Sequence, residues 1–189
     1  MESTAHEATV PVGQAALFDA PETNVPEDLG YRGSVACAAA GITYRQLDYW
    51  ARTGLVEPSI RTAHGSGSQR LYNFRDILVL KVVKRLLDTG VSLQNIRAAV
   101  AHLRSHGMHD LTRITLMSDG SSVFECTSED EVIDLVRGGQ GVFGIGVGSV
   151  WREVEGDLAE LPGERSDGEV VTPDGVTDEL AQRRARRVG

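Results

Sequence analysis

The sequence contains few of the features that tie a protein to covalent cross-links, membranes or secretion. Its only cysteines are Cys37 and Cys126, without paired spacing, which excludes a disulfide framework and a cysteine-based zinc motif. No apolar run approaches the ~20 residues that a membrane-spanning helix needs. Residues 1–20 lack the basic start and apolar centre of a signal peptide. We therefore expect a cytoplasmic protein with no membrane partner.

Signals of an enzyme are also scarce. The chain has 189 residues, of which 41% are hydrophobic, enough for one or two small domains but not for a large multidomain enzyme. No Ser/His/Asp or paired-carboxylate arrangement stands out. We expect neither catalysis nor a resident cofactor.

Positive charge is missing from most of the chain. The net charge is −8, and residues 1–30 contain six acidic residues but no Lys or Arg. Residues 108–163 contain eleven acidic residues against three basic ones, whereas residues 31–107 contain eleven basic residues against four acidic ones. Because Lys and Arg neutralise phosphates, segment 31–107 is the part suited to nucleic acid.

The stretch that begins at Thr43 predicts a short helix bounded at both ends. Thr43 and Gln46 have the spacing of a capping box, and Gly54 is the residue expected just past the end. Leu47 and Trp50 share its apolar side, while polar side chains occupy the exposed side of the first turns. This is how a helix that contacts a DNA groove presents its side chains.

The flanking segments complete a helix-turn-helix with a wing. Ser34 is predicted as the N-cap of an alanine-rich helix, and the turn at Gly41 leads into the second helix. Two β-type runs within residues 59–72 flank a Gly/Ser loop, which indicates a two-stranded hairpin. Asn73 and Ser92 are predicted to cap two further amphipathic helices.

The order of these parts over residues 31–106 resembles the DNA-binding domain of MerR-family transcriptional regulators. The motifs that carry the resemblance are Gly41–Leu55, Pro58, Arg61, Arg70, Tyr72, Asp76, Leu80 and the turn Thr89–Leu93. It implies a dimeric winged helix-turn-helix protein that binds a pseudo-palindromic operator, with double-stranded DNA and RNA polymerase as partners. Such a protein would be found at the nucleoid.

The resemblance also assigns DNA-contacting residues. They lie at the start of the second helix and on the wing: Thr43, Tyr44, Arg45, Gln46, Tyr49, Arg61 and Arg70. Arg45 and Gln46 are predicted to contact bases, since Arg pairs bidentately with guanine and Gln with adenine. Tyr49, Arg61 and Arg70 are assigned to phosphates or to the groove beside the wing.

Two features depart from the family pattern. Asp48 stands where the family has an arginine, so this acid must meet a base amino group or a neighbouring Arg. The chain also breaks at His106–Gly107 and shows no sustained heptads afterwards, which excludes the family's usual coiled coil. A dimer must be built in another way.

Residues 108–163 predict a small second domain for dimerisation or sensing. Its predicted elements are a hairpin around Asp119–Gly120, a helix with a capping box at Ser128 and Glu131, a third strand and a last helix, over residues 111–117, 123–126, 128–137, 142–147 and 150–161.

The predicted fold class is therefore α+β. A winged helix-turn-helix domain at 31–107 precedes a small α/β domain at 108–163. A disordered acidic tail at 1–30 and a flexible tail at 164–189 flank them.

Two patterns suggest ligand sites but lack the context for them. Gly139–Gly144 spells a dinucleotide-binding pattern, yet it follows a helix and leads into a strand, the reverse of the required order. His102, His106, His109 and Asp110 have the spacing of metal ligands. Without cysteines or a supporting shell we interpret them as a polar helix end, and we expect no metal.

Two alternative functions stay open. One is an architectural, excisionase-like protein that bends DNA with a similar winged fold. The other is a protein-interaction or ligand-sensing module acting through residues 108–163.

Overall fold

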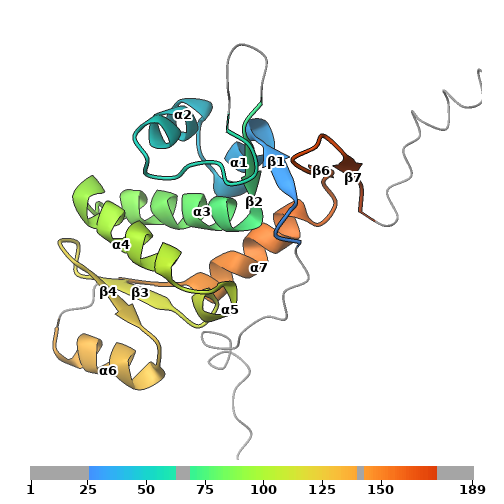
Figure 1. The fold of residues 1–189 in the computed structure, drawn as a ribbon. Coiled ribbons are helices and arrows are strands. Elements are labelled where there is room, and N and C mark those ends of the chain that lie inside the picture. The colour runs from blue at the N-terminus through green and yellow to red at the C-terminus, as the bar shows by residue number, and fades with distance from the viewer. Residues whose placement is uncertain (1–25, 63–68, 140–142, 174–189) are drawn as a thin grey trace, which may run out of the picture.

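The computed structural model describes residues 26–62, 69–139 and 143–173, and it confirms the α+β class (Figure 1). The helices are α1 Gly33–Ala40, α2 Tyr44–Arg52, α3 Phe74–Asp88, α4 Leu93–Ser105, α5 Met108–Leu111, α6 Glu129–Arg137 and α7 Val147–Leu158. The strands are β1 Gly30–Arg32, β2 Leu71–Asn73, β3 Thr115–Ser118, β4 Val123–Cys126, β5 Phe143–Gly146, β6 Gly163–Glu164 and β7 Val170–Val171. None of the helices in these ranges is long and apolar enough to span a bilayer.

The turn and the second helix of the helix-turn-helix form as their capping residues predict. Gly41 ends α1 with a φ of 68°, a left-handed conformation that suits glycine, and Gly54 follows α2 with the same φ. At the start of α2, the Gln46 backbone N–H donates to Thr43 Oγ1 at 3.2 Å, and Thr43 N–H donates to Gln46 Oε1 at 2.9 Å. The predicted capping box is therefore complete.

The prediction that Ser34 caps α1 is wrong. The helix begins at Gly33, and Arg32 occupies the N-cap position without a side-chain cap. Arg32 is also the last residue of β1, so its extended backbone passes directly from the strand into the helix. Pairing with β2 sets this start, through Tyr31 opposite Tyr72 and Arg32 opposite Leu71.

The base of the predicted wing is present. Leu71 N–H donates to the Arg61 carbonyl at 2.9 Å, and the two residues form an antiparallel bridge. Residues 63–68, where the Gly/Ser loop was predicted, lie outside the described residues.

Helix α3 forms the centre of the molecule, with α7 packed along it (Figure 1). Asn73 and Asp76 form a capping box at its start, and Ser92 caps α4 as predicted. The Phe74 ring at the start of α3 lies 4.5 Å from the fully buried Trp151 ring of α7, centroid to centroid. One hydrophobic core therefore continues from the helix-turn-helix into the C-terminal half.

The C-terminal half contains the predicted antiparallel sheet, in the order β4-β3-β5. Residues 111–114 are not part of its first strand, which begins at Thr115. Leu111 instead ends the one-turn helix α5, and the Thr112 hydroxyl donates to the His109 carbonyl at 2.7 Å. Helix α7 begins at Val147 rather than at residue 150. At the start of α6, Ser128 is the cap, but the Glu131 carboxylate accepts from Thr127 N–H at 2.6 Å rather than from Ser128.

A hairpin at the C-terminal end was not predicted. Strands β6 and β7 extend the β1–β2 sheet, with Glu164 opposite Gly30. Gly163 permits this close approach, since a Cβ atom there would lie 2.4 Å from Leu29 Cγ. Arg165 adds an ion pair to Asp28 at 2.9 Å. Residues 164–171, predicted as part of a tail, are thus held against the helix-turn-helix.

Candidate nucleic-acid interface

Helix α2 lies at the upper left of Figure 1, and its polar side chains share one exposed side. Tyr44 and Tyr49 are 66% and 47% exposed, and Arg45 is exposed beside them. The opposite side of the helix is fixed by Leu47 and Trp50, which are both buried. A helix anchored in this way holds its exposed side chains in a set direction.

Arg45 is the predicted contact residue with the most freedom to bind. Within the described ranges its guanidinium has neither an ion pair nor a hydrogen bond, so all its donors remain available. Because an arginine fork matches the O6 and N7 acceptors of guanine, this position suits a base contact.

Gln46 and Thr43 are occupied by the helix cap. Gln46 Oε1 accepts from Thr43 N–H and from the Thr43 hydroxyl at 3.0 Å. The amide N–H₂ group of Gln46 is left for a partner, but a bidentate contact to adenine also needs the oxygen. These cap contacts oppose the predicted bidentate contact of Gln46 to adenine unless the cap opens.

We predict that Thr43→Ala lowers the free energy of unfolding by about 1 kcal/mol, because the substitution removes the hydroxyl that caps α2. Urea denaturation followed by circular dichroism measures the effect. Thr43→Ser is the matched control and should stay close to the wild type. Equal losses for both variants would mean that the cap contributes nothing.

Asp48 and Arg70 join α2 to the base of the wing. Asp48 Oδ1 lies 2.9 Å from Arg70 Nη1, and its Oδ2 lies 2.9 Å from Arg52 Nη2. The Arg70 hydrogen bond is the main reason that the pKa of Asp48 is held below its usual value. Of the two partners that the sequence left open for this acid, the structure provides the neighbouring arginines.

A groove of about 460 Å³ lies between α2 and the wing base. Tyr44 and Asp48 line one side of it, and Arg70 and Tyr72 line the other. Burial raises the pKa of Tyr72 to about 12, so this hydroxyl stays neutral at the foot of the groove. The groove thus presents an arginine whose charge is only partly balanced by Asp48.

Arg61, the other predicted wing residue, is paired with a residue that sequence reasoning missed. The Glu164 carboxylate of β6 accepts a hydrogen bond from Arg61 and forms an ion pair at 3.1 Å with Arg32. These contacts hold the pKa of Glu164 below its usual value, with the Arg61 bond as the largest cause. No local pattern links Glu164 to Arg61, because 103 positions separate them.

Some basic residues of segment 31–107 form ion pairs within the protein and are not available to a nucleic acid. Lys81 of α3 lies 2.9 Å from Asp157 of α7, and Arg85 lies 2.6 Å from Glu153. The acidic excess of the C-terminal half is therefore used in part to neutralise α3. On α2 and at the wing base, Arg52 and Arg70 are paired with Asp48, and Arg61 is paired with Glu164. Among the described residues, Arg45 of α2 has no ion pair.

Asp76 fixes the chain where it leaves α2 for the wing. Its carboxylate accepts from the Ser59 N–H at 2.8 Å, from the Ser59 hydroxyl at 2.6 Å and from Asn73 N–H at 3.0 Å. Burial is the main cause that raises the pKa of this carboxyl. Asp76 thus acts as a support for the interface from within the core.

The described ends of the glycine pattern do not form a dinucleotide site. Gly139 follows α6, and Gly144 lies in β5, so the pattern runs from a helix to a strand. Residues 140–142 lie outside the described residues. The helix N-terminus that would hold a pyrophosphate is not at this position.

Known proteins have sequences similar to both halves of this chain. Residues 31–103 match the family model described as MerR HTH family regulatory protein. HTH-type transcriptional regulators of Mycobacterium bovis and Mycobacterium tuberculosis are each 63% identical over 177 residues, which cover 92% of this chain and 76% of the relative. Heavy metal-dependent transcription regulator 1 of Rhizobium meliloti is 32% identical over 69 residues, 36% of this chain and 45% of that protein.

Proposed function

Since this chain belongs to the MerR family of helix-turn-helix transcriptional regulators, we propose that it binds a specific DNA sequence as a homodimer on a pseudo-palindromic operator. RNA polymerase is the further partner that we propose, at promoters that contain the operator. Residues 108–163 are proposed to carry dimerisation or sensing.

The observation that carries the proposal is the exposed face of α2. Arg45 stands free on a helix whose opposite side is locked by Leu47 and Trp50. A fixed helix with an available arginine fork is suited to the major groove, where donor and acceptor patterns differ between base pairs. Tyr44 and Tyr49 lie on the same helix as exposed hydrogen-bonding groups.

Arg70 is proposed to contact the DNA backbone beside the wing. Asp48 holds its side chain at the edge of the groove, and a phosphate can share the guanidinium because Arg has five N–H donors. Arg61 lies opposite Leu71 at the wing base and is paired with Glu164. Its proposed phosphate contact therefore competes with an internal ion pair.

We predict that Arg70→Ala weakens binding to specific and non-specific DNA alike. Loss of one phosphate contact should reduce the slope of log K against log [salt] by about one unit. Fluorescence anisotropy at several salt concentrations measures both effects. A slope equal to that of the wild type would remove Arg70 from the backbone contacts.

The dimer is tested by sedimentation of the full chain with a labelled operator fragment. The proposal predicts two protomers on each two-fold site. One protomer per site, or arrays that grow along direct repeats, would contradict it and favour an architectural, excisionase-like role.

A further inference from the structure

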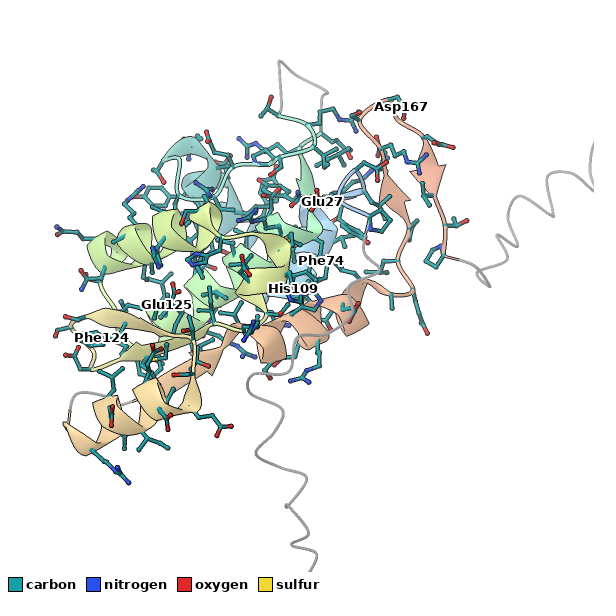
Figure 2. The ribbon with its side chains drawn as sticks, turned by 60° about the horizontal axis from the view of Figure 1, so that its bottom comes forward. Glu27, Phe74, His109, Phe124, Glu125 and Asp167 are labelled. Atoms are coloured by element: carbon teal, nitrogen blue, oxygen red, sulfur yellow. The ribbon has the colours of Figure 1, made fainter. Side chains whose placement is uncertain are left out.

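Three side chains that are distant from α2 converge between α4 and β4. His102 lies in the last turn of α4, His106 directly follows the helix, and their ring centroids lie 4.8 Å from each other. Glu125 of β4 faces them, with Oε2 at 2.5 Å from His102 Nε2 and Oε1 at 3.3 Å from His106 Nε2. One donor atom from each residue lies within 4.8 Å of the other two. Figure 2 shows Glu125 on the sheet beside α4, with His109 farther along the chain in α5.

The surroundings orient one imidazole for coordination. His106 Nδ1 lies 3.0 Å from the His102 backbone carbonyl, which can only accept, so this ring nitrogen donates the hydrogen bond. This contact directs the Nε2 atom of the same ring to Glu125. Histidine ligands of metals characteristically donate their second ring N–H to such a carbonyl, which fixes the tautomer and the ring plane.

The carboxylate has unmet bonding capacity. Glu125 Oε2 is shielded from solvent and has no hydrogen-bond partner among the described residues. The approach of His102 Nε2 to this oxygen at 2.5 Å lacks the direction of a hydrogen bond. A buried carboxylate oxygen without a bonded partner is costly, and a cation held by all three residues would satisfy it.

The cluster is open on one side. A surface pocket of about 360 Å³ borders His102 and Glu125, with Asn95 and Leu116 among its other walls. Three protein ligands with a fourth position open to water or a small ligand form a common arrangement at metal sites. The pocket supplies both the entry path and the room for that fourth ligand.

We propose that His102, His106 and Glu125 bind a divalent first-row transition-metal ion, of the class of zinc or cobalt. Two imidazoles and one carboxylate suit these ions, whereas Ca²⁺ and Mg²⁺ prefer oxygen ligands and Cu⁺ prefers sulfur. The ion fastens α4 to the β3–β4 hairpin. The site does not depend on the DNA-binding proposal, since all three ligands lie outside α2 and the wing.

This proposal changes the interpretation of the histidines. Their spacing in the sequence groups His102 and His106 with His109 and Asp110 and predicts a polar helix end. The structure places both of those neighbours in α5 and brings in Glu125 from a strand instead. A strand residue from a different element could not be paired with α4 by spacing alone.

The test is titration of the full-length protein with Co²⁺, followed by visible absorption and then by displacement with Zn²⁺. The wild type should bind one ion with ligand-field bands of a site containing nitrogen and oxygen ligands. His106→Gln and Glu125→Gln should each raise the dissociation constant by more than the ~10–100-fold typical of losing an outer-shell partner.

His109→Gln is the matched control, because it removes an exposed histidine of α5 that does not belong to the cluster. It should retain wild-type affinity and bands. Circular dichroism of the metal-free variants verifies that each is folded. The proposal would be overturned if the wild type does not bind Co²⁺, or if His106→Gln binds it equally strongly. The three residues would then be an ion-pair cluster only.

Discussion

Replacing Trp151 with alanine should destabilise the whole protein by about 3–5 kcal/mol, the loss expected when a fully buried aromatic side chain is removed. Trp151 is completely buried in α7, and its ring packs on Phe74 at the start of α3. Both the lost burial and the cavity left between the two helices contribute. Because α3 also supports the helix-turn-helix, the effect should reach α2.

The sequence offers a direct probe of this coupling. The chain has two tryptophans, so after Trp151→Ala the fluorescence comes only from Trp50, which is buried in α2. Guanidinium denaturation followed by this fluorescence and by circular dichroism should give a single shifted transition with both signals. A Trp50 transition that keeps the wild-type midpoint would mean that the two halves unfold separately.

Two further variants guard against a misleading result. Trp151→Phe keeps a ring against Phe74, so it should fold with a smaller loss if the alanine variant does not fold at all. Val170→Ala lies on the exposed side of β7 and should change the free energy of unfolding by no more than ~0.5 kcal/mol.

Replacing Arg45 with alanine should reduce the free energy of binding to the specific operator by about 1–3 kcal/mol. Binding to unrelated DNA should be nearly unchanged, since non-specific affinity comes from phosphate contacts elsewhere on the surface. The measurement is anisotropy with operator and scrambled duplexes of equal length at one salt concentration. The ratio of the two dissociation constants gives the specificity.

Arg137→Ala provides the matched control for charge. It removes the same charge from the last turn of α6, which lies at the opposite end of the molecule from α2 in Figure 1. The control should retain the wild-type specificity ratio. A loss that is equal on both duplexes for Arg45→Ala would show that Arg45 contacts the backbone and carries no sequence information.

The parts of the fold that could be predicted depend on residues close together in the sequence. The capping boxes at Thr43 and Asn73 and the left-handed glycine at Gly41 depend on residues within a few positions of each other, so the sequence determines them directly. The Asp48–Arg52 pair has the i, i+4 spacing of helix ion pairs and was also accessible from sequence. These features place the end of α1 and the starts of α2 and α3.

The features that could not be predicted from the sequence depend on pairing between distant residues. The β6 strand pairs with β1 through residues more than a hundred positions apart. Glu164 of β6 then forms ion pairs with Arg61 and Arg32. The same holds for Glu125, which reaches the histidines of α4 from a strand. Such contacts depend on how the elements pack, and periodicity along one element does not encode them.

The central claim is sequence-specific binding by a two-fold dimer. Its most direct test is to select bound fragments from random and genomic DNA with the full-length protein at ~0.15 M salt, where attraction between exposed charges is already well screened. Sequencing should return a pseudo-palindromic motif whose half-sites are about one helical turn apart, as expected for a dimer on one face of the DNA. Recovery of no motif, or of direct repeats only, would contradict the claim.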